Sequence, residues 1–166
     1  MAVEKSLAKA GYLAHRLSSN RNITAMSVEQ NKAIALRFMN QGWGTNPEWK
    51  TIWDKLMTPD VRYHFNSEPA PIVGLESNKA FNASLFEGFP NIEHTLEAIV
   101  AENDKVVYRT ALKGTHTGQF LGIPPTGKIA EIGDFTMLKI VDSRISEWWY
   151  DCNLLALMKQ LGLIFD

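Results

Sequence analysis

The spacing of apolar residues changes near Ile92, and this change constrains the fold more than any other feature of the sequence. Before it, apolar residues recur every three or four positions, as on amphipathic helices. Helices are predicted over residues 27–42, 47–57 and 75–86. After it, apolar and polar residues alternate, which is typical of half-buried strands. Strands are predicted over residues 92–101, 105–116, 129–141 and 144–151, after a first short strand at 61–66.

Helices followed by consecutive long strands indicate an α+β domain. The segments 102–105 and 141–144 are short enough to be tight hairpin turns, so we expect an antiparallel sheet. A curved, cone-shaped sheet of this kind wrapped over helices has an apolar interior, which suits a small-molecule pocket.

Two of the predicted helices begin at capping residues. Ser27 is followed three residues later by Gln30, which together form a capping-box sequence. Asn46 followed by Pro47 predicts the start of the second helix, because asparagine is a good cap and proline suits the first helical position.

Composition excludes several classes of function. The 166 residues are 45% apolar and 21% charged, which fits a globular domain. The net charge of −1 implies no broad basic face, so nucleic acid is not an expected partner. No apolar run is long enough to span a bilayer, and we expect a cytoplasmic protein without membrane contact. Four scattered histidines and the single Cys152 lack metal-ligand spacing, so no metal is expected.

Residues 1–25 differ from the rest of the chain in charge, with four basic residues and one acidic residue. This charge pattern matches a weak amphipathic targeting helix. Leucine and alanine also recur there at helical spacing, which favours an extra helix docked on the domain or on a neighbouring subunit. We therefore divide the chain into an N-terminal helical extension, 1–25, and an α+β cone domain, 26–166.

Five short motifs occur in a particular order along the chain. They are Met26-Ser-Val-Glu-Gln-Asn-Lys, Phe89-Pro-Asn-Ile-Glu, Gly114-Thr-His-Thr-Gly, Gly122-Ile-Pro-Pro-Thr-Gly and Gln160-Leu-Gly. From about Met26 to Gly162 the chain resembles the SnoaL-like polyketide cyclase family of the nuclear-transport-factor-2-like superfamily. The resemblance implies an α+β cone, often dimeric or tetrameric. It also implies intramolecular aldol cyclisation by an acid–base aspartate, without metal or cofactor.

These implications lead to one preferred function and two alternatives. The preferred function is a cofactor-free cyclase or isomerase acting on a hydrophobic, carbonyl-bearing small molecule. One alternative keeps the fold but changes the chemistry to that of a hydratase, dehydratase or epoxide-hydrolase-like enzyme. The other is a module that binds a lipophilic ligand without catalysis.

Asp151 and His116 are the candidate catalytic residues. Alternation from Ile145 places Asp151 on one strand face with Trp149, where an apolar cavity would raise the pKa of the carboxyl group. The competing interpretation is a surface aspartate near a helix start. His116 is in phase with Tyr108 on its strand and could transfer protons at neutral pH, or could be a structural residue that anchors the following loop.

Other residues are candidates for binding the substrate. Trp149 and Tyr108 would form pocket walls, and Phe120 would lie in a loop folded over the mouth of the cone. His64 and Asn66 share a strand face, and His94 stands on an apolar face where a satisfied core histidine is more common than a ligand contact. Asp134 is either a second pocket carboxylate or a charge at the edge of the sheet.

Asn153 marks a departure from the family. It is predicted to cap a final helix, 154–161, that Gly162 ends. Relatives usually carry an aspartate at this position. If that aspartate is catalytic, this chain has lost it or uses Asp151 instead; if it is only the helix cap, asparagine serves equally well.

The last strand also suggests a partner. Alternation directs Ser146, Trp148 and Tyr150 to the face opposite Asp151. Two aromatic side chains on an open sheet face need covering, so we expect a homodimer or a higher homo-oligomer built on this face.

Overall fold

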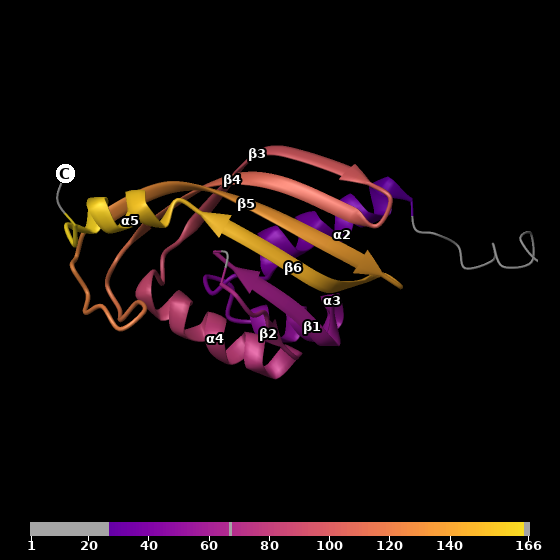
Figure 1. The fold of residues 1–166 in the computed structure, drawn as a ribbon, viewed down its shortest axis with the longest axis horizontal. Helices are drawn as coiled ribbons and strands as arrows, with labels where there is room; N and C mark the ends of the chain where they lie inside the picture. Colours follow the sequence, from indigo (N-terminus) through magenta and orange to yellow (C-terminus); the bar gives the residue numbers. More distant parts are fainter. Residues whose placement is uncertain (1–26, 67, 165–166) are drawn as a thin grey trace, which may run out of the picture.

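The computed structural model describes residues 27–66 and 68–164 of the chain, so the predicted N-terminal extension lies outside the described residues. The elements, in chain order, are α2 (Val28–Gln41), α3 (Trp49–Leu56), β1 (Met57–Phe65), β2 (Ile72–Val73), α4 (Leu75–Gly88), β3 (Glu93–Glu102), β4 (Lys105–Thr115), β5 (Ile129–Val141), β6 (Arg144–Cys152) and α5 (Leu154–Leu161). Figure 1 shows their arrangement.

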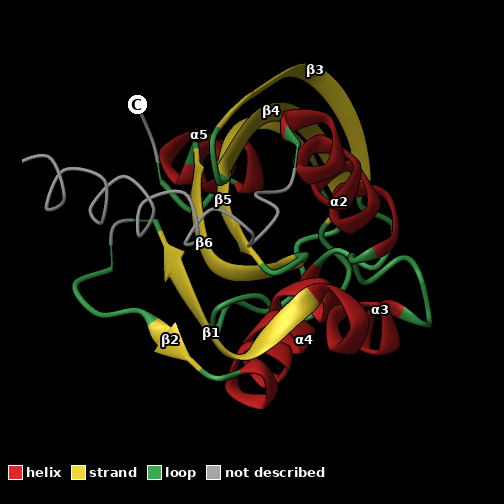
Figure 2. Cartoon of the chain, turned by 90° about the vertical axis from the view of Figure 1, so that its right-hand side faces the viewer, coloured by secondary structure: helices red, strands yellow, loops and turns green. Residues whose placement is uncertain are grey.

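The six strands form one curved, open sheet in the order β2-β1-β6-β5-β4-β3. Figure 2 shows the sheet curling around the helices, and residues of α2, α3 and α4 pack against its concave face. The predicted α+β class is confirmed. Four of the five strand pairs are antiparallel, whereas β1 runs parallel to β6. No hairpin joins β1 to β6, so the connection does not force them to be antiparallel.

The first helix begins as predicted. The Ser27 hydroxyl accepts the Gln30 backbone N–H at 3.2 Å, and the Gln30 side chain accepts the Ser27 N–H at 2.9 Å. The second helix begins at Trp49, later than predicted. The Asn46 side chain instead accepts the backbone N–H of Glu48 at 3.0 Å, which closes a turn before the helix.

The first strand is longer than predicted, because it begins at Met57 directly after α3. Its pairing with β6 is irregular between Met57 and Arg62, and Pro59 lies in this interval. Proline donates no ladder hydrogen bond, so such an irregularity accommodates it.

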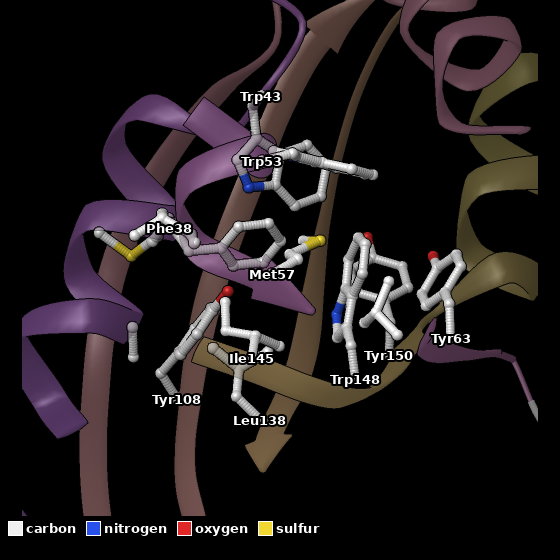
Figure 3. Packing of buried hydrophobic residues seen from close by; sticks show 14 of the residues in the cluster. Phe38, Trp43, Trp53, Met57, Tyr63, Tyr108, Leu138, Ile145, Trp148 and Tyr150 are labelled. Atoms are coloured by element: carbon white, nitrogen blue, oxygen red, sulfur yellow. The ribbon is translucent and has the colours of Figure 1, made fainter. Parts of the chain in front are cut away.

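Aromatic residues form the core between the sheet and the helices. Figure 3 shows side chains converging there, with Trp148 of β6 among them. Its ring lies 5.0 Å from that of Phe38 and 5.7 Å from that of Trp53, and it stacks on Tyr63 at 3.9 Å. The indole N–H of Trp53 donates to the Gly42 carbonyl oxygen at 2.7 Å.

The prediction that Trp148 and Tyr150 point outward is wrong, because both are buried on the concave face. The cause is a β-bulge in the pairing of β5 with β6. Lys139 pairs with Glu147, but the next residue of β5 pairs with Ile145. One additional residue reverses the alternation, so Ile145 and Trp148 both point inward.

Candidate functional site

An apolar pocket lies between the concave face of the sheet, α4, α5 and the loop from β4 to β5, with a cavity of about 70 Å³. Seven of the residues that line it are aromatic: Trp43, Tyr63, Phe65, Phe86, Phe89, Phe120 and Tyr150. Phe120 comes from the loop, where backbone hydrogen bonds of 3.0 and 2.8 Å join it to Ile123. The loop therefore covers one side of the pocket with Phe120.

Asp134 is a buried carboxylate on the concave face, where it is only 2% exposed. Thr110 and Cys152 are its direct neighbours on β4 and β6, and Cys152 lines the pocket. The Thr110 hydroxyl lies 2.8 and 2.9 Å from the two carboxylate oxygens, and Tyr150, another lining residue, donates a hydrogen bond from its side chain. The structure thus places Asp134 beside the pocket and not at the edge of the sheet.

The environment of Asp134 suits proton transfer. Burial raises the pKa of its carboxyl group to about 6, although the hydrogen bonds from Thr110 and Tyr150 oppose this shift. A carboxyl group with this pKa exists in both protonation states near neutral pH, which general acid–base catalysis requires.

Two phenols lie close to this carboxylate. Burial raises the pKa of both Tyr63 and Tyr150 well above the ordinary value, so both hydroxyl groups remain protonated donors. Burial also raises the pKa of the Cys152 thiol. The Asn66 side chain holds this end of β6, because it accepts the Cys152 backbone N–H at 2.9 Å and donates to the sulfur at 3.4 Å.

The raised pKa of Asp134 predicts a pH-dependent stability. Asp134 binds its proton more tightly in the folded state, so its contribution is fully present below pH 3.8 and is lost as the pH rises through about 6. We expect the stability of the wild type relative to Asp134→Asn to fall by about 2–3 kcal/mol between pH 4 and pH 7. Urea unfolding of both proteins at the two pH values measures this difference.

The comparison with Asp134→Asn is necessary because His94 changes the stability with pH in the opposite direction to Asp134. Burial lowers the pKa of His94 to about 4, so its contribution is lost as the pH falls through the same range. A difference between wild type and Asp134→Asn that does not change with pH would contradict the prediction.

The predicted orientation of Asp151 and Trp149 is wrong. The bulge that turns Trp148 inward turns both of these residues to the convex face, where Asp151 is exposed and away from the pocket. Trp149 stacks on His64 at 5.1 Å, and His64 Nε2 lies 2.9 Å from a carboxylate oxygen of Glu147. His64 therefore also lies on the convex face, so none of these three candidates reaches the pocket.

His116 is fully buried and anchors the loop that carries Phe120. Its Nδ1 accepts the Thr126 backbone N–H at 3.3 Å, and its ring stacks on Phe89 at 5.1 Å. Burial lowers its pKa, which keeps the imidazole neutral. This arrangement favours the structural interpretation of His116 over a role in proton transfer.

The remaining candidates also have defined positions. Tyr108 lies on the concave face, as its phase predicts, but it packs in the core and not along the pocket. His94 lies on the same face, against Trp43. The Asn153 side chain accepts the Ala156 backbone N–H at 3.0 Å. Asn153 is thus the cap of α5, which agrees with the simpler explanation for its presence.

Tyr63, Tyr150 and Cys152 were not predicted to be site residues. The sequence does contain a signal for which face of the last strand points to solvent, because Glu147 and Asp151 fall on the same face. Two carboxylates on one face favour the solvent side of a sheet, and Trp148 and Tyr150, which alternate with them, then face the core.

Neither a metal cluster nor a membrane-spanning helix is present in the described part of the chain. Across residues 27–66 and 68–164, no three His, Cys, Asp or Glu side chains are grouped so that they could hold a metal ion. Of the helices in the same segments, none has the length and apolarity needed to cross a membrane.

A curved sheet with helices on its concave side and an apolar pocket between them defines a nuclear-transport-factor-2-like α+β domain. The chain belongs to the SnoaL-like polyketide cyclase family, whose family model matches residues 33–161. Comparison with curated proteins found no significant match.

Several solved structures are similar to this chain. A proposed SnoaL-like polyketide cyclase from Jannaschia sp. CCS1 is 37% identical, with 82% of this chain and 94% of that chain covered and a TM-score of 0.79. AclR, a proposed hydroxylase from Streptomyces galilaeus, is 25% identical, with coverage of 84% and 100% and a TM-score of 0.71. IdmH, a proposed polyketide cyclase from Streptomyces antibioticus, is 25% identical, with coverage of 80% and 99% and a TM-score of 0.67.

Proposed function

We propose that the chain is a cofactor-independent cyclase or isomerase that acts on a hydrophobic carbonyl compound, with Asp134 as its acid–base residue. The observation that carries this proposal is the buried Asp134 carboxyl group, with a pKa of about 6, beside an aromatic pocket. Membership of the family supports the class of reaction. The site differs from the one predicted from sequence, because Asp134 takes the role first given to Asp151.

The reaction begins with proton transfer to Asp134. The carboxylate removes a proton from a carbon next to the substrate carbonyl, and the electron pair of the broken C–H bond forms an enolate. Tyr63, a neutral donor on the pocket wall, stabilises the enolate oxygen by a hydrogen bond. The single hydroxyl hydrogen of Tyr150 is donated to the Asp134 carboxylate. Thr110 orients the carboxylate during this step.

In a cyclisation, the enolate carbon then attacks a second carbonyl carbon of the same molecule. The new C–C bond leaves a negative charge on that carbonyl oxygen, which receives the proton from Asp134. In an isomerisation, Asp134 returns the proton to a different carbon. Both reactions restore the carboxylate and need no external oxidant or reductant.

The pocket is small, so binding a large substrate requires part of its wall to move. A cavity of about 70 Å³ is smaller than the ~300–1,000 Å³ typical of pockets that enclose drug-sized ligands. A polycyclic substrate therefore requires the Phe120 loop or α5 to move outward when it binds.

A test of this function needs no knowledge of the natural substrate. The probe is 2-tetralone, a bicyclic ketone with a fused benzene ring and an acidic C–H group, incubated with the protein in D₂O. We expect NMR to show deuterium incorporation at the acidic carbon faster than in buffer alone. If saturation-transfer NMR shows that 2-tetralone binds but does not exchange, the module that only binds a lipophilic ligand becomes the better explanation.

We also propose that the chain forms a homodimer through the convex face of the sheet. The contact residues differ from those predicted, because Trp148 and Tyr150 point inward. Phe135 is instead 55% exposed on this face, beside Met137 and opposite Asp151. An exposed aromatic side chain on a broad sheet face favours association with a matching face.

We expect light scattering at micromolar concentration to give the mass of a dimer for the wild type. Phe135→Glu should give a monomer, because each subunit would bring a charge into an apolar contact. Leu155→Glu is the control, since Leu155 is 63% exposed but belongs to α5 and not to a strand of the sheet. A monomeric wild type would overturn this proposal.

A further inference from the structure

Buried polar groups whose hydrogen-bonding capacity is unused lie at and behind one wall of the pocket. Trp43 lines the pocket, and its ring lies 4.0 Å from that of His94. The indole Nε1 of Trp43 and both ring nitrogens of His94 are buried and have no hydrogen-bond partner among the described residues. Buried polar groups in folded proteins are nearly always paired, so this cluster requires an explanation.

The neighbouring Trp53 shows that the backbone near Trp43 can accept a hydrogen bond from an indole N–H. Trp53 donates to the carbonyl oxygen of Gly42, the residue directly before Trp43. The Trp43 N–H has no such acceptor and belongs to a residue on the pocket wall. Its unused donor is therefore available to a bound molecule.

His94 complements this donor. Burial lowers the pKa of His94 to about 4, so the ring is neutral at pH 7 and offers one donor and one acceptor nitrogen. His94 pairs with Leu112 across the sheet, and Leu112 and Ile92 line the pocket. His94 thus lies next to the pocket on β3, two strands away from Asp134 on β5.

We propose that Trp43 and His94 form a hydroxyl-binding subsite of this pocket. The Trp43 N–H donates to the hydroxyl oxygen of the ligand, and the hydroxyl hydrogen is donated to the unprotonated ring nitrogen of His94. This combination selects a phenol or enol over a carbonyl, which has no hydrogen to donate. The assignment rests on the proposed function in taking this pocket as the substrate site, and it adds a ligand hydroxyl distinct from the carbonyl on which Asp134 acts.

The probes are phenol and toluene, which differ only in a hydroxyl or methyl group on the ring. Their dissociation constants are measured by NMR titration of the full-length wild type, His94→Phe and Asp134→Asn. We expect the preference for phenol over toluene to fall by about three- to tenfold in His94→Phe, as the loss of one hydrogen bond predicts. Asp134→Asn should retain the preference.

Several results would overturn the proposal. An equal preference for phenol over toluene in the wild type and His94→Phe would do so. A preference that is lost only in Asp134→Asn would also do so, because it would place the ligand hydroxyl beside Asp134 instead of beside His94. If neither probe binds at millimolar concentration, the subsite also fails. Phenol binding involves no proton transfer from carbon, so its outcome is independent of the 2-tetralone exchange experiment.

A second measurement covers the case in which His94→Phe does not fold. In the wild type, phenol should shift the Trp43 indole N–H signal and the His94 ring nitrogen signals, and toluene should shift them much less. Equal shifts with the two probes would contradict the assignment.

Discussion

Asp134→Asn is expected to reduce the rate of deuterium exchange into 2-tetralone by about 10²–10⁴-fold, the usual contribution of a general acid–base group. The amide keeps the shape of the side chain but cannot accept a proton near neutral pH. The wild-type rate should also rise as the pH increases through about 6, because the carboxylate is the active form in the first step.

Asp151→Asn provides a matched control for this experiment. The two aspartates lie on neighbouring strands but on opposite faces of the sheet, and Asp151 is exposed on the convex face. We expect Asp151→Asn to retain the wild-type exchange rate. Circular dichroism of both variants would verify that the fold is preserved. Equal losses of activity in the two variants would exclude Asp134 as the specific base.

Trp148→Ala is expected to lower the free energy of unfolding by about 3–5 kcal/mol, the range for removing a large aromatic side chain from a core. Trp148 is 1% exposed and contacts the rings of Phe38 and Trp53. Guanidinium unfolding monitored by circular dichroism measures the loss. If the alanine variant does not fold, Trp148→Phe removes less volume and should show a smaller loss of the same sign.

The adjacent residue supplies the comparison for this prediction. Trp149 is half-buried on the convex face, and its main ring contact is His64. We expect Trp149→Ala to cost only ~1 kcal/mol, mostly from the lost ring stacking. If the alternation is counted from Ile145 without the bulge, Trp149 is the inward residue, and Trp149→Ala should then cost more stability than Trp148→Ala. A larger loss for Trp149→Ala than for Trp148→Ala would therefore contradict the orientation of β6.

Local signals in the sequence were sufficient to predict most elements of the fold. The capping box at Ser27, the cap at Asn153 and the hairpin turns depend on residues within a few positions of one another. The change in hydrophobic period near Ile92 likewise separates helices from strands without any long-range contact. The parallel pairing of β1 with β6 was not predicted, because it depends on segments far apart in the chain.

The sequence by itself determined the order of the helices and of every strand except the short β2, the α+β class and the family motifs. The tertiary structure decided that Asp151 turns away from the pocket, through the bulge between β5 and β6, and that Asp134 lies beside it. A bulge is a mismatch between two strands, so it depends on how Lys139 and Glu147 align across the sheet. Because the side-chain period is two, one additional residue exchanges the faces of Trp148 and Trp149. The burial of Asp134, and hence its raised pKa, likewise depends on neighbours from β4 and β6 that only the assembled sheet brings beside it.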